Sequence, residues 1–305
     1  MKHCISLSDY SASDITHVLD VAFDLRDQRS RGQHSQVLAG QTLAMIFEKP
    51  SLRTRVSFEQ GMYELGGHAI VLGDEVGLGR RESVADVTRV LAGMVQGIAA
   101  RVFEHQKLVE MADHASVPII NMLSDETHPC QALADVMTMI DALGRDLRGR
   151  TLVYVGDGNN VAHSLAVICG KLGIDFTMAT PPGYELPQAY VDAIMADVPT
   201  MNFQMCHDPV QAVRQADAVY TDTWVSMGQE DEKQKRLAAF TGFQLNEELL
   251  AKAPSHAIVL HCLPAYRGVE ITDAVMDGPM SRVFAQAHNR MHAQKGLLAV
   301  LMGGR

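Results

Sequence analysis

The sequence predicts an α/β protein built from two domains, each a parallel sheet flanked by helices. The chain has 305 residues, of which 47% are hydrophobic, and this length exceeds the usual size of a single domain. Apolar, β-rich runs alternate with longer helix-like segments from one end of the chain to the other. This alternation is typical of parallel sheets with helices on both faces.

The apolar runs fall into two sets of four. The first set is TLAMIF, HAIVLG, GIAARVF and VPIINM. It is followed by QALADVMTMIDALG, which has apolar residues at helical spacing and ends at Gly144, and then by the charged turn RDLRGR. The second set is TLVYVGD, DFTMAT, DAVYTDTW and AIVLHCLP. We therefore place the domain division near residues 135–150 and expect HNRMHAQKGLLAVLMGGR to form an amphipathic terminal helix.

Charge and cysteine content exclude several classes of protein. The 26 basic and 36 acidic side chains give a net charge of -10, which offers no reason to expect nucleic acid or an anionic membrane as a partner. The five cysteines form no Cys-X-X-Cys pair, so neither a disulfide framework nor a structural zinc site is indicated. With no apolar run long enough to span a bilayer and no signal-peptide core at the N-terminus, we expect a reducing, cytoplasmic setting.

The stretch FEKPSLRTRVSFE concentrates hydroxyls and guanidinium groups where a strand ends and a helix begins. Pro50 and Ser51 mark the helix start, where unpaired backbone N–H groups and the positive end of the helix dipole suit a phosphate. Arg53 and Arg55 are two residues apart and cannot point the same way on a helix, so we assign only Arg53 to the ligand. The alternative is an ordinary capped helix with solvated arginines, in which Arg55 pairs with Glu59.

The stretch DETHPCQALAD puts His128 and Gln131 directly after the run VPIINM. The ends of strands in open α/β sheets are where ligands bind. A neutral imidazole and a carboxamide suit a carbonyl oxygen and an amide N–H, respectively. The alternative is a helix cap with a solvated histidine.

The stretch TLVYVGDGNNVAHS partly matches a dinucleotide-binding fingerprint. Gly156 and Gly158 follow a strand, but Val161 occupies the third glycine position and no acidic residue ends the next strand, which disfavours NAD binding and a dehydrogenase. What remains is a glycine-rich turn that presents two amides. Asn160 could bind an amino-acid carboxylate, while Asn159 could simply satisfy the turn.

Two further strand ends carry polar side chains. YTDTWVSMGQE presents Asp222 and Ser226, and IVLHCLPAYRG presents Cys262. A carboxylate in such a place suits an ammonium group. Taken singly, each could be a loop cap, and Cys262 an inert buried thiol.

Taken together and in order, these stretches resemble the aspartate/ornithine carbamoyltransferase family. FEKPSLRTR resembles the family's Ser-Thr-Arg-Thr-Arg signature, and HPCQALAD, GDGNN, DTWVSMG, HCLPA and HNRMHAQK follow in family order and spacing. The resemblance covers nearly the whole chain and is closest to the ornithine enzymes. It implies transfer of the carbamoyl group of carbamoyl phosphate to the δ-amine of L-ornithine, giving L-citrulline and phosphate in arginine biosynthesis, with no metal or organic cofactor.

The resemblance also implies an organisation. Residues 1–135, completed by the terminal helix 289–305, would bind carbamoyl phosphate, and residues 136–288 would bind ornithine. The basic unit would be a homotrimer with active sites at subunit interfaces, with further assembly of trimers left open.

Site residues are carried over motif by motif. For carbamoyl phosphate the resemblance implies Ser51, Leu52, Arg53, Thr54, Arg101, His128, Gln131, Cys262, Leu263 and Arg290. For ornithine it implies Asn160, Asp222, Ser226 and Met227. The catalytic residues implied are Arg101, His128, Cys262 and Arg290. Arg101 and His128 would polarise the carbamoyl carbonyl, and Gln131 would hold its amide.

Two positions depart from the family pattern. Leu52 stands where the family usually has threonine, and Gly77 stands where many members have a glutamine that reaches the neighbouring subunit's ligand. Leucine at position 52 is also similar to relatives that act on N-acylated ornithine, although Asp222 would then have no ammonium partner. An enzyme for another amine, an aspartate enzyme and a non-catalytic relative remain the alternatives.

Overall fold

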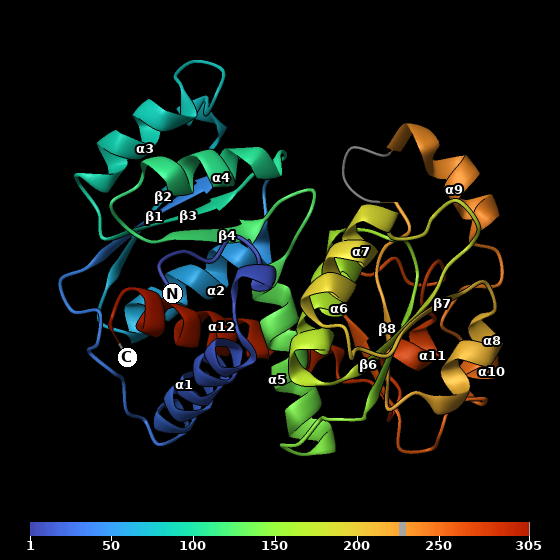
Figure 1. Ribbon diagram of the computed structural model, residues 1–305. Helices are drawn as coiled ribbons and strands as arrows, with labels where there is room; N and C mark the ends of the chain where they lie inside the picture. The colour runs from blue at the N-terminus through green and yellow to red at the C-terminus, as the bar shows by residue number, and fades with distance from the viewer. Residues whose placement is uncertain (226–229, 305) are drawn as a thin grey trace. The chain divides into compact units, whose positions relative to one another are not determined.

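The computed structural model describes residues 1–225 and 230–304, which form two compact units (Figure 1). Unit 1 comprises Met1–Ala134 and His288–Arg305, and unit 2 comprises Asp135–Ala287. The division falls within two helices, α5 (Pro129–Leu143) and α12 (Val283–Leu301). Each unit contains one sheet in which all paired strands are parallel, so the predicted α/β class is confirmed.

Unit 1 is built on a four-stranded sheet in the order β2-β1-β3-β4. The strands are β1 (Thr42–Phe47), β2 (His68–Leu72), β3 (Gly97–Arg101) and β4 (Ile119–Leu123). The helices are η1 (Leu7–Asp9), α1 (Ala12–Ser30), α2 (Leu52–Glu64), η2 (Asp74–Val76), α3 (Val84–Ala92) and α4 (His105–His114). Figure 1 shows α3 and α4 on one face of this sheet and α1, α2 and α12 on the other.

The central strands of unit 1 are buried on both faces, as expected for a parallel sheet covered by two layers of helices. Ala44 and Ile46 of β1 face a cluster that includes Leu108 and Met111 of α4. The intervening Met45 is also fully buried. The register brings the last residues of β1 and β3 side by side, because Phe47 pairs with Arg101.

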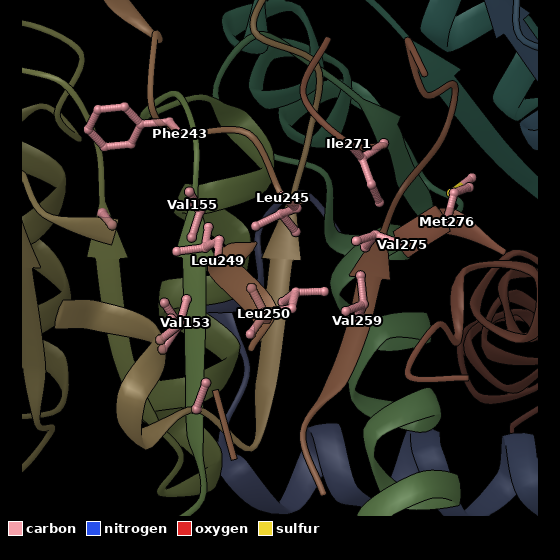
Figure 2. Packing of buried hydrophobic residues seen from close by; sticks show 14 of the residues in the cluster. Val153, Val155, Phe243, Leu245, Leu249, Leu250, Val259, Ile271, Val275 and Met276 are labelled. Atoms are coloured by element: carbon pink, nitrogen blue, oxygen red, sulfur yellow. The ribbon is translucent and has the colours of Figure 1, made fainter. Parts of the chain in front are cut away.

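Unit 2 is built on a five-stranded sheet in the order β7-β6-β5-β8-β9. The strands are β5 (Thr151–Val155), β6 (Asp175–Ala179), β7 (Phe203–Cys206), β8 (Ala218–Thr221) and β9 (Ile258–His261). The helices are α6 (Asn160–Leu172), α7 (Gln188–Asp197), α8 (Pro209–Ala212), η3 (Val213–Gln215), η4 (Glu230–Glu232), α9 (Lys233–Ala239), α10 (Glu247–Leu250) and α11 (Asp273–Met276). Figure 2 shows valines of β5 and β9 packed with side chains of α10 and α11 in the core of this unit.

Two expectations about the elements need correction. The strand β7 was not predicted, because this edge strand has a short polar interruption and its middle residues, Gln204 and Met205, are exposed. The terminal helix is not amphipathic over its centre: it begins at Val283, and residues 292–299 are all buried. Among the described residues, no helix combines the length and apolar character required to cross a bilayer.

Candidate active site

The start of α2 has the features of an anion site. Ser51 is the N-cap residue, and its Oγ accepts the N–H of Thr54 at 3.4 Å and donates to Thr54 Oγ1 at 3.0 Å. Arg55 is exposed and its Nε donates to Glu59 at 3.1 Å, so the i, i+4 pair that belongs to the alternative interpretation is present. Arg53 is half-buried and makes no hydrogen bond or ion pair with another described residue, which leaves it available to a ligand.

Arg290 connects α12 with α2 and α5 in unit 1. Its side chain is buried, and its two terminal nitrogens donate to Thr54 Oγ1 at 3.1 Å and to Gln131 Oε1. A guanidinium held in a fork by two side chains is fixed in orientation. The structure therefore brings Thr54, Gln131 and Arg290 together, although they are far apart in the sequence.

Arg101 and His128 are the two buried groups expected to polarise a carbonyl. Arg101 is the last residue of β3, and His128 precedes α5, where its carbonyl accepts the N–H of Gln131 at 3.0 Å. Burial, followed by the charges of Arg290 and Arg101, holds the pKa of His128 well below its usual value. The imidazole is therefore neutral at pH 7, and the alternative of a solvated histidine is wrong.

Lys49 was missed by the sequence analysis. Its side chain is 8% exposed, and its Nζ lies 4.3 Å from the centre of the Phe103 ring. Burial and then the charge of Arg101 lower the pKa of Lys49. The only signal in the sequence is its place directly before Pro50, where a lysine is ordinarily solvated.

In unit 2, three strand ends converge on Asp222. Its Oδ2 accepts Asn159 Nδ2 at 2.9 Å, and its Oδ1 accepts the N–H of Thr223 at 2.7 Å and the thiol of Cys262 at 2.9 Å. Asp222 is 6% exposed. Among the described residues, all of these hydrogen-bond partners are neutral.

The two asparagines of the glycine-rich turn have different roles. Asn159 is the N-cap of α6, and its Oδ1 accepts the N–H groups of Val161 and Ala162 at 3.0 and 3.1 Å. The expectation that Asn159 satisfies the turn is therefore confirmed, and its Nδ2 also orients Asp222. Asn160 is the first residue of α6 and is half-buried.

The turn after β9 is held by a pair of buried side chains. Leu263 has φ 59°, in the left-handed region, and its N–H donates to Nδ1 of His261 at 2.9 Å. The Nε2 of His261 lies 3.1 Å from Glu270 Oε1, and both side chains are fully buried. Burial and then Asp222 raise the pKa of Cys262 well above its usual value, so this residue is a thiol, not a thiolate.

Asp222, His261 and Cys262 also place three possible metal-ligand atoms within 4.8 Å of one another. However, both nitrogens of His261 are used, one by Leu263 and one by Glu270. A metal would have to displace one of these bonds. The described residues at this point are therefore organised as a hydrogen-bonded cluster, and no step of the chemistry is assigned to a metal.

A buried ion pair supports the same end of unit 2. Arg236 NH1 lies 2.9 Å from Asp157 Oδ2 and 3.1 Å from the carbonyl of Trp224. It thereby connects the glycine-rich turn to the segment that follows Asp222. Sequence analysis missed this pair because its members are far apart in the chain. Of the residues predicted for ornithine, Ser226 and Met227 lie outside the described residues.

The fold and the two polar clusters together define the class of protein. It has two parallel-sheet units: in the first, arginines lie at the N-terminus of α2, and in the second, the carboxylate of Asp222 is held by neutral donors. The comparison with protein families then gives the particular family. Residues 2–141 match the aspartate/ornithine carbamoyltransferase carbamoyl-P binding domain, and residues 148–301 match the Asp/Orn binding domain of the same family. The chain belongs to the aspartate/ornithine carbamoyltransferase family.

Similar proteins cover the full length of the chain. The ornithine carbamoyltransferase of Thermococcus kodakarensis is 48% identical over 99% of this chain and 97% of its own length. The anabolic ornithine carbamoyltransferase of Pyrococcus furiosus is 48% identical over 99% of this chain and 97% of its own length. A solved structure of ornithine carbamoyltransferase from Pyrococcus furiosus, 47% identical, superposes with a TM-score of 0.96 over 100% of this chain and 98% of that chain.

Proposed function

We propose that this enzyme transfers the carbamoyl group of carbamoyl phosphate to the δ-amine of L-ornithine, giving L-citrulline and phosphate in arginine biosynthesis. The observation that carries the proposal is the Asp222 cluster: a buried carboxylate whose described hydrogen-bond partners are all neutral can accept a substrate ammonium group. Relatives named ornithine carbamoyltransferase at 48% identity support it.

Carbamoyl phosphate would bind to unit 1. The N-terminus of α2, with Ser51, the backbone N–H of Leu52, and Arg53, would hold the phosphate, because N–H groups and the helix dipole favour an anion there. Arg290, already fixed by Thr54 and Gln131, would add a buried positive charge.

The carbonyl of the carbamoyl group would be polarised by Arg101 and His128. A neutral imidazole donates an N–H hydrogen bond and does not transfer its proton to the carbonyl oxygen. His128 would therefore act as a hydrogen-bond donor to the oxyanion as it forms. Gln131 would hold the amide of the carbamoyl group. The amine forms the new C–N bond, the C–O bond to phosphate breaks, and the phosphate carries away the electron pair; the amine then loses a proton to solvent.

Ornithine would bind to unit 2 through its α-amino acid end. Asp222 would pair with the α-ammonium group and Asn160 would bind the α-carboxylate, with Ser226 and Met227 completing the set. Because its thiol stays protonated and donates to Asp222, Cys262 would position the carboxylate and line the site together with Leu263, and it would not attack the substrate.

The nucleophile must be a neutral amine. The δ-amine of ornithine resembles that of lysine, with a pKa of about 10.4, so at pH 7 on the order of one molecule in a thousand is neutral, at a cost on the order of 4 kcal/mol. Nearby cations disfavour the ammonium form. The buried positive charges of unit 1, including Lys49, would lower the pKa of an amine bound beside them.

We further propose that copies of the chain assemble as a homotrimer. Leu52 and Val56 are 75% and 54% exposed, and they lie one turn apart on the same side of α2. An exposed apolar surface of this kind is suited to contact another copy. Sedimentation should give three chains per particle, and Val56→Glu should dissociate it; a monomeric wild type would contradict the proposal. We also propose that the protein works in the cytoplasm, as expected from the sequence, because its five cysteines are free thiols.

A citrulline-formation assay tests the substrate assignment. Carbamoyl phosphate is offered with ornithine, N-acetylornithine, putrescine or aspartate, and we expect the highest kcat/KM for ornithine. N-Acetylornithine is the critical competitor, because acylation removes the charge that Asp222 would bind. Faster turnover of N-acetylornithine or aspartate would refute the assignment, and no turnover with any acceptor would support a non-catalytic protein.

A further inference from the structure

A polar cavity lies in unit 1, lined in part by the C-terminal end of α2. It has a volume of about 430 Å³, within the range of about 300–1,000 Å³ typical of small-molecule sites. Its lining residues are Arg26, Arg29, Ser30, His34, Gln60, Tyr63, Glu64 and His292. Glu64 ends α2 and Thr54 lies in its first turn, so at 1.5 Å per residue they are about 15 Å apart along the helix. The cavity is therefore distinct from the residues assigned to carbamoyl phosphate.

Positive charge exceeds negative charge around this cavity. Glu64 is 1% exposed and is shared by two cations, with Lys295 Nζ at 2.7 Å and Arg29 Nε at 2.8 Å. Arg26 also lines the cavity, with its NH1 donating to Asn289 Oδ1 at 3.2 Å and its guanidinium 4.8 Å from the centre of the Phe23 ring. The side chain of Arg29 is 47% exposed, and no other described residue bonds its two terminal nitrogens.

His292 lies in the wall of the cavity, and one of its ring nitrogens is buried with no hydrogen-bond partner among the described residues. This nitrogen is Nδ1, and the side chain is 7% exposed. Burial, followed by the charges of Lys295, Arg29 and Arg26, lowers the pKa of His292 to about 4, while Glu64 acts in the opposite direction. His34 is the other titratable imidazole of the lining.

The pKa of Glu64, the one carboxyl group among the described residues of the lining, is also lowered. Burial alone would raise its pKa, but hydrogen bonds from Lys295, Gln60 and Arg29 lower it to about 2. Beyond burial and hydrogen bonding, both shifts include the charge of Lys295, and the pKa of His292 is also lowered by the charges of Arg29 and Arg26. Such a cavity disfavours a further proton and favours an anion.

We propose that this cavity binds a small oxyanion with two or more negative charges, a phosphate or a dicarboxylate, held by the guanidinium group of Arg29, with the charge of Arg26 adding to the attraction. Guanidinium groups recognise these planar or tetrahedral oxyanions through paired N–H donors. The bound anion offsets the excess positive charge and allows His292 to take up a proton from solvent. The proposal does not depend on the transferase reaction.

The proposal is tested by following the NMR resonance of the His292 imidazole in the full-length protein. The resonance of His292 is assigned by its loss in His292→Gln, and its titration is followed from pH 7 to pH 5 in sodium chloride, in inorganic phosphate and in succinate at equal ionic strength. With a pKa of about 4, about a tenth of His292 is protonated at pH 5. Phosphate or succinate should raise the pKa by about one unit or more, so that about half is protonated. Circular dichroism verifies that the protein remains folded.

Three variants locate the binding. Arg29→Gln should weaken the anion response about ten-fold or more, because it removes a charged donor. Arg31→Gln removes the same charge two residues further on, from an exposed residue outside the lining, and should behave as the wild type. Arg53→Gln should leave the His292 response intact, which separates this cavity from phosphate bound at the start of α2. A His292 pKa that is equal in all three salts, or a response unchanged by Arg29→Gln, would overturn the proposal.

Discussion

The two units place polar clusters at the carboxyl ends of their strands, but the clusters have opposite character. In unit 1 the cluster is cationic: Arg101 and Arg290 are buried around a neutral His128. In unit 2 the cluster is centred on the single carboxylate of Asp222. A cationic cluster suits a phosphate and a developing oxyanion, whereas a carboxylate suits an ammonium group, so the charge pattern supports the proposal that each unit binds one substrate.

Within unit 2, two buried carboxylates show what distinguishes structural from binding groups. Asp157 and Asp222 are 7% and 6% exposed and follow neighbouring strands, β5 and β8. Asp157 is paired with Arg236 at 2.9 Å, whereas Asp222 receives only neutral donors among the described residues. We infer that the carboxylate of Asp157, with its counter-ion, stabilises the fold, and that the carboxylate of Asp222 is the one suited to bind a ligand.

The largest effect is expected from a structural carboxylate. Glu64→Gln leaves Lys295 buried without its anion, and this should lower the free energy of unfolding by about 3–5 kcal/mol. Glu59→Gln breaks only the exposed pair with Arg55 and should cost about 0.5 kcal/mol or less. Urea denaturation of both variants measures the difference, and equal midpoints would contradict the distinction.

The same carboxylate gives acid sensitivity with a definite sign. The pKa of Glu64 is lowered to about 2, so its contribution is present above the unfolded value of about 4.5 and is lost as pH falls through about 2. The stability difference between wild type and Glu64→Gln should therefore narrow below about pH 4.5. Its persistence at lower pH would show that the pair does not act through ionisation.

Removing a carbonyl-polarising group should affect catalysis more than folding. Arg101→Ala and His128→Ala each remove a donor that strengthens as the oxyanion forms, which is worth roughly 3–4 kcal/mol in kcat. The KM for ornithine should change little, because ornithine is assigned to unit 2. Steady-state kinetics and a thermal melt are compared for each variant; activity lost only in proportion to folded protein would indicate a structural role.

Asp222→Asn should reduce the kcat/KM for ornithine. Loss of a charged partner for the ammonium group should lower kcat/KM for ornithine by about 2–3 kcal/mol, with KM for carbamoyl phosphate unchanged. Asp157→Asn is the matched control, since it removes a carboxylate of equal burial and should reduce thermal stability instead. If Asp157→Asn reproduced the ornithine defect without loss of stability, the distinction between the two carboxylates would fail.

The sequence could predict much of this pattern, and the failures have physical causes. Eight apolar runs correspond to eight strands. Seven of these strands are mostly buried, as expected for continuously apolar parallel strands, and β2 has an apolar run although none of its residues is buried. The edge strand β7 has a polar residue in its middle and was not recognised. The motif residues at strand ends were recognisable from local pattern. Arg236, His261 and Lys49 were not, because their roles come from partners distant in sequence or from burial that single residues do not reveal.

A smaller effect is expected from pH, which sets the fraction of ornithine whose δ-amine is neutral. Because only the neutral δ-amine reacts, apparent affinity for ornithine should rise about ten-fold per pH unit between about pH 7 and 9, following a pKa near 10.4. Asp222 is proposed to bind the α-ammonium end of ornithine, so this prediction concerns the δ-amine and not the group proposed to pair with Asp222. A KM for ornithine that is independent of pH over this range would show that the enzyme binds the charged amine.

The smallest effect concerns Leu52, where unit 1 departs from the family pattern. Threonine at this position could give the phosphate a hydroxyl in addition to the backbone N–H, so Leu52→Thr should tighten carbamoyl phosphate binding by about ten-fold if nothing compensates.

The structure sharpens this test in two ways. Arg80, in the loop that contains Gly77, is paired with Asp74, so any compensating charge from this arginine must compete with that pair. Leu52 itself is 75% exposed and lies on the same side of α2 as Val56, so its replacement also tests assembly. Val56→Thr is the matched control, because it makes a similar apolar-to-threonine change one turn away from the phosphate residues. A lower KM for carbamoyl phosphate in Leu52→Thr alone supports the hydroxyl, whereas equal shifts in both variants would trace the effect to contacts between copies of the chain.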